Sequence, residues 1–175
     1  MKDGLVAKMQ CKMTIIDNQK KNAICILMEK LSSMTEKWAI TGSFGLALQG
    51  VNINPNDIDI ITSQNGVFVI QLLCADYIKS KVEYLTTTTM RSYFGVMEID
   101  SCAIEFFGEI ENFLENNYWD YHKQWDRNII EIEIEELQIP VLKLEYELHI
   151  YKKLWMSERA DLIARKLQFL NENLQ

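Results

Sequence analysis

Apolar and polar positions along this chain follow two periods, which predict a mixture of helices and strands. The period of about 3.6 residues predicts helices from Asn18 to Ser32-Ser33, from Phe44 to Gln49, around residues 67–74, and twice after Pro140. The two closing helices carry apolar stripes made of Leu144, Leu148, Tyr151 and Trp155, then Leu162, Ile163, Leu167 and Leu170. Buried runs and strict alternation predict strands over 38–41, 57–62, 81–86, 93–99, 102–107 and 130–135.

The order of these elements predicts an α/β fold built on a mixed sheet. A strand–helix–strand unit comes first, a hairpin turning at Asp100-Ser101 follows, and two helices close the chain. At 175 residues the chain suits a single domain. We divide it into a loose arm over 1–16, an α/β core over 17–140 and a C-terminal helical pair over 141–175.

Composition narrows the class of protein. Hydrophobic residues make up 48% of the chain, which is enough for a core, but no apolar run approaches the roughly 18 residues that span a bilayer. The first residues lack the apolar stretch of a secretory signal, so we expect a cytoplasmic location and no membrane partner. The net charge of −7 makes nucleic acid a less favoured partner than a small molecule or a protein.

Cysteine and histidine usage argues against a zinc site. The four cysteines, Cys11, Cys25, Cys74 and Cys102, form no C-x-x-C pair, and we interpret them as buried free thiols. His122 and His149 lack the spacing of metal ligands.

Two aspartates carry the strongest chemical signal. Asp57 and Asp59 are two residues apart in a strand pattern, so their side chains would share one face while Ile58 and Ile60 bury the other. Two carboxylates this close need a cation between them, and oxygen ligands favour Mg²⁺, or Mn²⁺ in its place. The alternative is that Asp57 belongs to a turn after Pro55 and that Asp59 is solvated.

A turn just upstream is suited to a phosphate. Gly42-Ser43 follows a buried strand and opens a short helix, where backbone N–H groups and the helix dipole favour an anion. Gly42 lets the backbone approach closely and Ser43 adds a hydroxyl.

Two further charged residues are candidates for the same site. Glu105 lies in the middle of an apolar strand pattern and could be a third metal ligand or accept a proton; the alternative is a charge facing outward from an edge strand. Arg91 could bind a phosphate, but a surface ion pair is the other interpretation.

Taken together, Gly42-Ser43, Asp57-x-Asp59 and a later strand with Glu105 resemble the minimal nucleotidyltransferase superfamily, whose fold is shared with DNA polymerase β. The similarity covers residues 38–108 and points to the small stand-alone prokaryotic members. The resemblance implies an enzyme that transfers a nucleoside monophosphate from an NTP, most simply ATP, to a hydroxyl. It implies that Ser43 contacts the triphosphate, that Asp57 and Asp59 bind Mg²⁺, and that Glu105 is the third ligand or the base.

One departure from the family pattern concerns a lysine. Many relatives carry Arg-x-Lys-Asp between the last helices, whereas this chain reads Arg159-Ala160-Asp161. Lys152, or Lys153, is then the candidate for the missing cation. The departure also leaves open a second class of function: a weakly active or inactive nucleotide-binding module, such as one half of a toxin–antitoxin pair. The acceptor, the base preference and the oligomeric state stay open.

Overall fold

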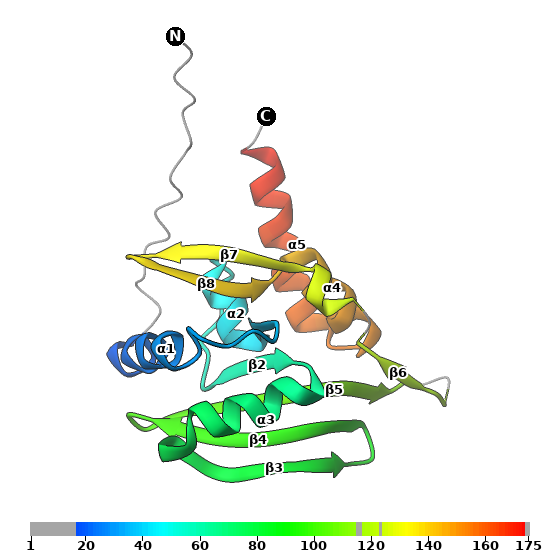
Figure 1. Ribbon diagram of the computed structural model, residues 1–175. Helices are drawn as coiled ribbons and strands as arrows, with labels where there is room; N and C mark the ends of the chain where they lie inside the picture. The colour runs from blue at the N-terminus through cyan, green and yellow to red at the C-terminus, as the bar shows by residue number, and fades with distance from the viewer. Residues whose placement is uncertain (1–16, 115–116, 123, 174–175) are drawn as a thin grey trace.

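The computed structural model describes residues 17–114, 117–122 and 124–173. Within these ranges the chain forms five α-helices, two 3-10 turns and eight strands in one sheet (Figure 1). The helices are α1 (Asn18–Lys30), α2 (Gly42–Leu48), α3 (Gln64–Leu73), α4 (Leu144–Lys153) and α5 (Ser157–Glu172). The strands are β1 (Trp38–Thr41), β2 (Ile58–Thr62), β3 (Ile78–Thr86), β4 (Met90–Ile99), β5 (Cys102–Phe113), β6 (Trp119–Tyr121), β7 (Ile129–Ile134) and β8 (Leu137–Leu142). The short 3-10 turns are η1 (Ala75–Tyr77) and η2 (Trp125–Arg127).

The sheet is mixed, as the sequence predicts. Its strand order is β3-β4-β5-β2-β1-β8-β7, with β6 added beside the end of β5. β1 and β2 are antiparallel neighbours, while β2 pairs in parallel with β5 and β1 in parallel with β8. The predicted hairpin is confirmed, because β4 and β5 join through Asp100 and Ser101, which have φ of 49° and 63°. Two residues with positive φ are typical of the tight turn that fits twisted strands.

Alternation along the central strands separates two faces. Ile58 and Ile60 of β2 point into the main core, which is covered by α1 and α3. Asp59 and Ile61 point to the opposite face, where Ile61 packs with Trp125 of η2 and Tyr146 of α4. This second face therefore carries both a small apolar cluster and the acidic residues.

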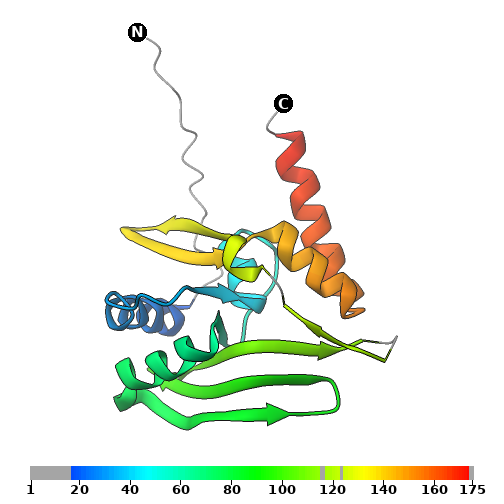
Figure 2. The same cartoon turned by 45° about the vertical axis from the view of Figure 1, so that its right-hand side comes forward.

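The C-terminal helices pack on the part of the fold that leads into the acidic face. Leu144 and Tyr151 of α4, with Ala160 and Ile163 of α5, enclose an apolar cluster with Leu46 of α2. Both views show α4 beside the sheet and the end of α5 extending away from it (Figures 1 and 2). This packing brings residues from the end of the chain next to the β1–α2 turn.

Three details differ from the sequence-based expectations. Cys25 is exposed, not buried, because α1 turns Ala23, Ile24 and Leu27 towards the core; Cys74 and Cys102 are buried free thiols. Trp155 does not continue the α4 stripe, since the helix ends at Lys153 and Trp155 is 70% exposed with a φ of 58°.

The third difference is a strand that the sequence pattern did not predict: residues 137–142, including Pro140, form β8, which lies between β1 and β7. The proposed arm over 1–16 and Cys11 lie outside the described residues. In the part of the chain that is described, none of the helices combines the length and the apolar character needed to cross a membrane.

Candidate active site

A row of three residues crosses the acidic face of the sheet. Thr41 of β1 is the Cα partner of Asp59 of β2, and Asp59 is the Cα partner of Glu105 of β5. Directly opposed residues on neighbouring strands place their side chains about 5 Å apart. β5 lies between β4 and β2, so Glu105 is on an interior strand and not on the edge that the alternative interpretation required.

Asp57 lies beside this row, two residues before Asp59 along the chain. It lies one residue before β2, in a bend, and its side chain is half-buried. Its charge raises the pKa of both Asp59 and Glu105, which shows that the three carboxylates share one electrostatic environment. The structure thus places Glu105 next to Asp59, with Asp57 near enough for its charge to act on both, and their joint role in binding a metal stays a prediction.

The β1–α2 turn lies against Asp59. Gly42 has a φ of +64°, and a Cβ atom at this position would overlap the Asp59 carboxylate. A glycine is needed here both for the backbone conformation and for the space beside the aspartate. Ser43, which follows in α2, is 6% exposed.

The turn is held on its other side by a glutamate that the sequence pattern did not indicate. Oε1 of Glu147, on α4, accepts hydrogen bonds from Oγ1 of Thr41 at 2.6 Å and from the backbone N–H of Gly42 at 3.2 Å. Glu147 is only 4% exposed. The Gly42 N–H, which the sequence suggested as a phosphate donor, is thus engaged by a carboxylate in this structure.

Burial and mutual repulsion perturb the acidic groups strongly. Burial, followed by the charges of Asp57, Glu105 and Glu147, raises the pKa of Asp59 to about 7. Burial also raises the pKa of Glu147 to about 7, against the opposing effect of its two hydrogen bonds. The pKa of Glu105 is raised, chiefly by burial. Carboxylates whose pKa is raised by burial and by neighbouring charges mark this face as a candidate functional site.

Arg159 is a second residue that the sequence pattern left without a role. Its positive charge lowers the pKa of Asp59, Glu147 and Tyr151. Its Nη1 donates to the Tyr151 hydroxyl oxygen at 3.2 Å. Arg159 thus brings a guanidinium from α5 to the acidic face, and it belongs to the stretch Arg159-Ala160-Asp161 in which the lysine of the family pattern is absent.

The lysines considered for that role are placed differently. Lys153 forms an ion pair with Asp120, with Nζ and Oδ2 at 2.9 Å, and Lys152 is exposed on α4. Both Glu147 and Arg159 could be found only through the packing of α4 and α5 on α2, which no local sequence pattern encodes.

Arg91 lies at the far end of β4 in an ion pair. Its Nη1 is 3.6 Å from Oε2 of Glu111, and its guanidinium carbon is 3.8 Å from the centre of the Trp119 ring. The ion pair is the second of the two interpretations that its sequence position allowed. A nucleotide contact by Arg91 stays a prediction.

The carboxylates of the acidic face are the donors that a divalent metal would use here. Carboxylate oxygens are the ligands that Mg²⁺ and Mn²⁺ prefer. Among the described residues, no group of three or more His, Cys, Asp or Glu side chains converges closely enough to enclose a metal ion. Mg²⁺ usually takes one or two carboxylates and completes its shell with water and substrate phosphates. The residues present fit such an open site.

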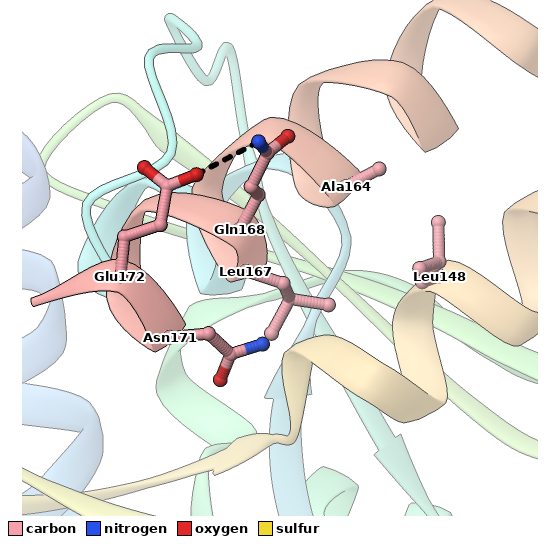
Figure 3. A pocket seen from close by; sticks show the side chains of 6 residues that line it. All are labelled: Leu148, Ala164, Leu167, Gln168, Asn171 and Glu172. Atoms are coloured by element: carbon pink, nitrogen blue, oxygen red, sulfur yellow. Dashed lines mark hydrogen bonds between the residues drawn. The ribbon is translucent and has the colours of Figure 1, made fainter. Parts of the chain in front are cut away.

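Two surface hollows lie away from this chemistry. One, of about 390 Å³, is an apolar hollow between α4 and α5, lined by residues that include Leu148 and Leu167 (Figure 3). The other, of about 630 Å³, is polar and lies near Lys37 and Ser63, at the opposite end of the β1–β2 ladder from Asp59. Neither is lined by the row of carboxylates.

Comparison with known proteins decides the family. The sequence profile of the aminoglycoside-2''-adenylyltransferase family matches residues 23–164, which is most of the chain. The chain belongs to this family. It is therefore a nucleotidyltransferase, and the predicted superfamily and enzyme class are confirmed. A comparison with curated proteins gave no significant sequence match.

Solved structures show the same fold. A Thermotoga maritima protein, itself provisionally assigned as a nucleotidyltransferase, is 31% identical with a TM-score of 0.75, over 90% of this chain and 96% of that one. The lincosamide antibiotic adenylyltransferase LnuA, solved with lincomycin bound, is 15% identical with a TM-score of 0.51, over 83% of this chain and 96% of that one. The antibiotic-resistance factor ANT(2'')-Ia is 13% identical with a TM-score of 0.58, over 91% and 92%. The predicted nucleotidyltransferase fold is confirmed.

Proposed function

We propose that this family member transfers AMP from ATP to a hydroxyl group of a small-molecule acceptor, in a reaction that depends on Mg²⁺. The observation that carries the proposal is the row formed by Asp59 and Glu105 on neighbouring strands, with Asp57 beside it and Gly42 packed against Asp59. Family membership supplies the class of reaction, and the row supplies residues suited to it.

Asp57 and Asp59 are the residues that would hold the metal. Burial, followed by the charge of Asp57, raises the pKa of Asp59 to about 7, and a bound divalent cation would offset the repulsion between the two carboxylates. When bound, the metal neutralises the charge that develops on the phosphate oxygens during transfer. Asp59 is fixed within β2 and Asp57 in the bend just before it, so the two carboxylates need little rearrangement to receive a cation.

Glu105 is suited to accept the proton. The acceptor oxygen attacks the α-phosphorus, the bond from that phosphorus to the oxygen bridging the β-phosphate breaks, and pyrophosphate leaves. The hydroxyl proton goes to the Glu105 carboxylate, whose raised pKa brings it closer to the range of an effective general base.

Arg159 and Ser43 are proposed to bind the triphosphate. Arg159 supplies a bidentate donor at the acidic face, in place of the lysine that relatives carry. Ser43 follows Gly42 in the turn beside Asp59 and can donate its hydroxyl.

The acceptor class rests on the family and on charge. The family takes its name from an aminoglycoside adenylyltransferase, and the net charge of −7 favours a neutral or cationic acceptor over nucleic acid. A hydroxyl-bearing small molecule is therefore proposed, with aminoglycosides as the first candidates.

The test is transfer of label from ATP carrying a radioactive α-phosphate, with Mg²⁺ and a panel of hydroxyl acceptors that includes aminoglycosides. We expect labelled acceptor with the native protein and none with the double variant Asp57→Asn, Asp59→Asn. Asp76→Asn, an exposed aspartate on η1, is the matched control and should transfer at the native rate. Unchanged transfer by the double variant would refute the assignment.

A further inference from the structure

Glu147 is a buried acid that the proposed chemistry does not use. It lies in the first turn of α4, is 4% exposed, and comes from a part of the chain more than 100 residues away from the turn that it contacts. A buried carboxylate is costly unless its oxygens find donors. The two donors that it finds are both in the β1–α2 turn.

The direction of these hydrogen bonds is fixed by the donors. A backbone N–H can only donate, so Oε1 of Glu147 must act as the acceptor for Gly42 whether or not the carboxyl group is protonated. Thr41 donates its hydroxyl to the same oxygen at 2.6 Å. One oxygen atom therefore fixes two consecutive residues.

The same two residues border Asp59. Thr41 is its Cα partner across the β1–β2 ladder, and Gly42 occupies the space next to its carboxylate so closely that a methyl group would not fit. The turn is held between Glu147 on one side and Asp59 on the other. A shift of the turn would change the place of Asp59 and of Ser43 together.

We propose that Glu147 is a positioning residue, which acts by clamping the Thr41–Gly42 turn against Asp59 and so sets the geometry in which metal and nucleotide bind. The proposal rests on the proposed function for its effect on nucleotide binding, but the clamp itself is a property of the free protein. Glu147 touches neither substrate nor metal in this role. Helix α4 then contributes to the active site through this side chain, in addition to packing beside it.

Three substitutions and one control separate the clamp from general stability. Glu147→Ala removes the acceptor, and Glu147→Gln keeps an oxygen at the same place without the charge. Thr41→Val removes one of the two donors with little change of shape. Glu145→Ala, on the exposed side of the same helix, is the matched control.

The first measurement needs no ligand. The amide proton of Gly42, observed by ¹H–¹⁵N NMR, should move upfield in Glu147→Ala because its hydrogen bond to the carboxylate is lost. It should stay close to the native position in Glu145→Ala. An unchanged Gly42 resonance in a folded Glu147→Ala protein would overturn the clamp.

The second measurement is the affinity for Mg²⁺-ATP by calorimetry, with the melting temperature of each variant recorded beside it. Loss of the oxygen that accepts both hydrogen bonds predicts binding at least about tenfold weaker for Glu147→Ala. Glu147→Gln should stay within about threefold of the native protein, since it keeps the acceptor. A Glu147→Ala protein that melts at a lower temperature but binds Mg²⁺-ATP with native affinity would show that Glu147 is only structural. Equal losses of affinity in Glu147→Gln and Glu147→Ala would contradict the role of Glu147 as a hydrogen-bond acceptor.

The measurements distinguish a failure of the proposed function from a failure of the Glu147 clamp. If the native protein does not bind Mg²⁺-ATP, the proposed function fails, while the Gly42 resonance still decides the clamp. If Glu147→Ala does not fold, Thr41→Val carries the comparison, with an expected loss of affinity of about threefold or more. Native affinity in a folded Thr41→Val protein, together with an unmoved Gly42 resonance, would overturn the proposal.

Discussion

Gly42 is the residue at which the smallest chemical change should have the largest effect on activity. Gly42→Ala adds one methyl group at a φ of +64°, and that methyl group would occupy the volume of the Asp59 carboxylate. Either Asp59 must rotate away or the turn must move. Both responses disturb the relation between the turn and the proposed metal ligands.

The magnitude follows from two separate contributions. An alanine in the left-handed region costs about 1–2 kcal/mol, and relief of the overlap adds about 1–3 kcal/mol to the loss of folding free energy. A displacement of reacting groups by about 1 Å lowers a rate by about 100-fold. We therefore expect Gly42→Ala to lose about 2–5 kcal/mol of stability and about 100-fold or more in kcat/KM.

Gly50→Ala is the matched control for the backbone contribution. Gly50 has a φ of +78° and follows the other end of α2, away from the acidic row. It should lose about 1–2 kcal/mol and keep near-native kcat/KM. Urea unfolding and steady-state adenylyl transfer measure the two quantities. Equal kcat/KM for the two variants would refute the idea that the space beside Asp59 is what requires glycine.

Three further predictions concern the charged groups. The folded protein raises the pKa of Asp59 and Glu147 from below 5 to about 7, so it binds more protons than the unfolded chain between those values, and the contribution of these groups to stability should fall as pH rises from about 4 to about 7. Melting temperatures of the metal-free protein should therefore fall across this range, and Asp59→Asn should make the fall smaller. A fall of the same size in the variant would contradict the assignment. Arg159→Ala should weaken ATP binding by about tenfold or more, and by more than Lys152→Ala does, because the charge of Arg159 acts on the carboxylates of the acidic face. If calorimetry ranks the two variants in the opposite order, Lys152 and not Arg159 binds the triphosphate. Glu105→Gln should lower kcat by about 100-fold or more with little change in Mg²⁺-ATP affinity, and a loss confined to affinity would make Glu105 a ligand and not the base.

The sheet and its acidic row follow from local patterns. The alternation of Ile58 and Ile60 with Asp59 predicts which side chains face the core, and β2 has this arrangement because a slip of one residue would turn Asp59 into the core. The strand begins one residue later than predicted, so Asp57 lies in the bend before it. The hairpin at Asp100-Ser101 is likewise encoded in two turn-prone residues between strands.

The remaining features depend on contacts between distant segments. Pro140 made residues 137–142 resemble a loop before a helix, yet they form β8, which pairs with β7 and, through Val141, with β1. Glu147 and Arg159 sit in ordinary amphipathic helix patterns, where exposed charge is the usual outcome. Only the packing of α4 and α5 against Leu46 turns these two side chains towards the turn and Asp59.

The most direct test of the central claim is calorimetric titration of ATP into the native protein, first with Mg²⁺ and then with EDTA. If Asp57 and Asp59 hold a metal between themselves and the nucleotide, binding should require Mg²⁺ and should be lost in Asp59→Asn, while Asp76→Asn binds as the native protein does. ATP binding that is equally strong in EDTA, or unchanged in Asp59→Asn, would contradict the account.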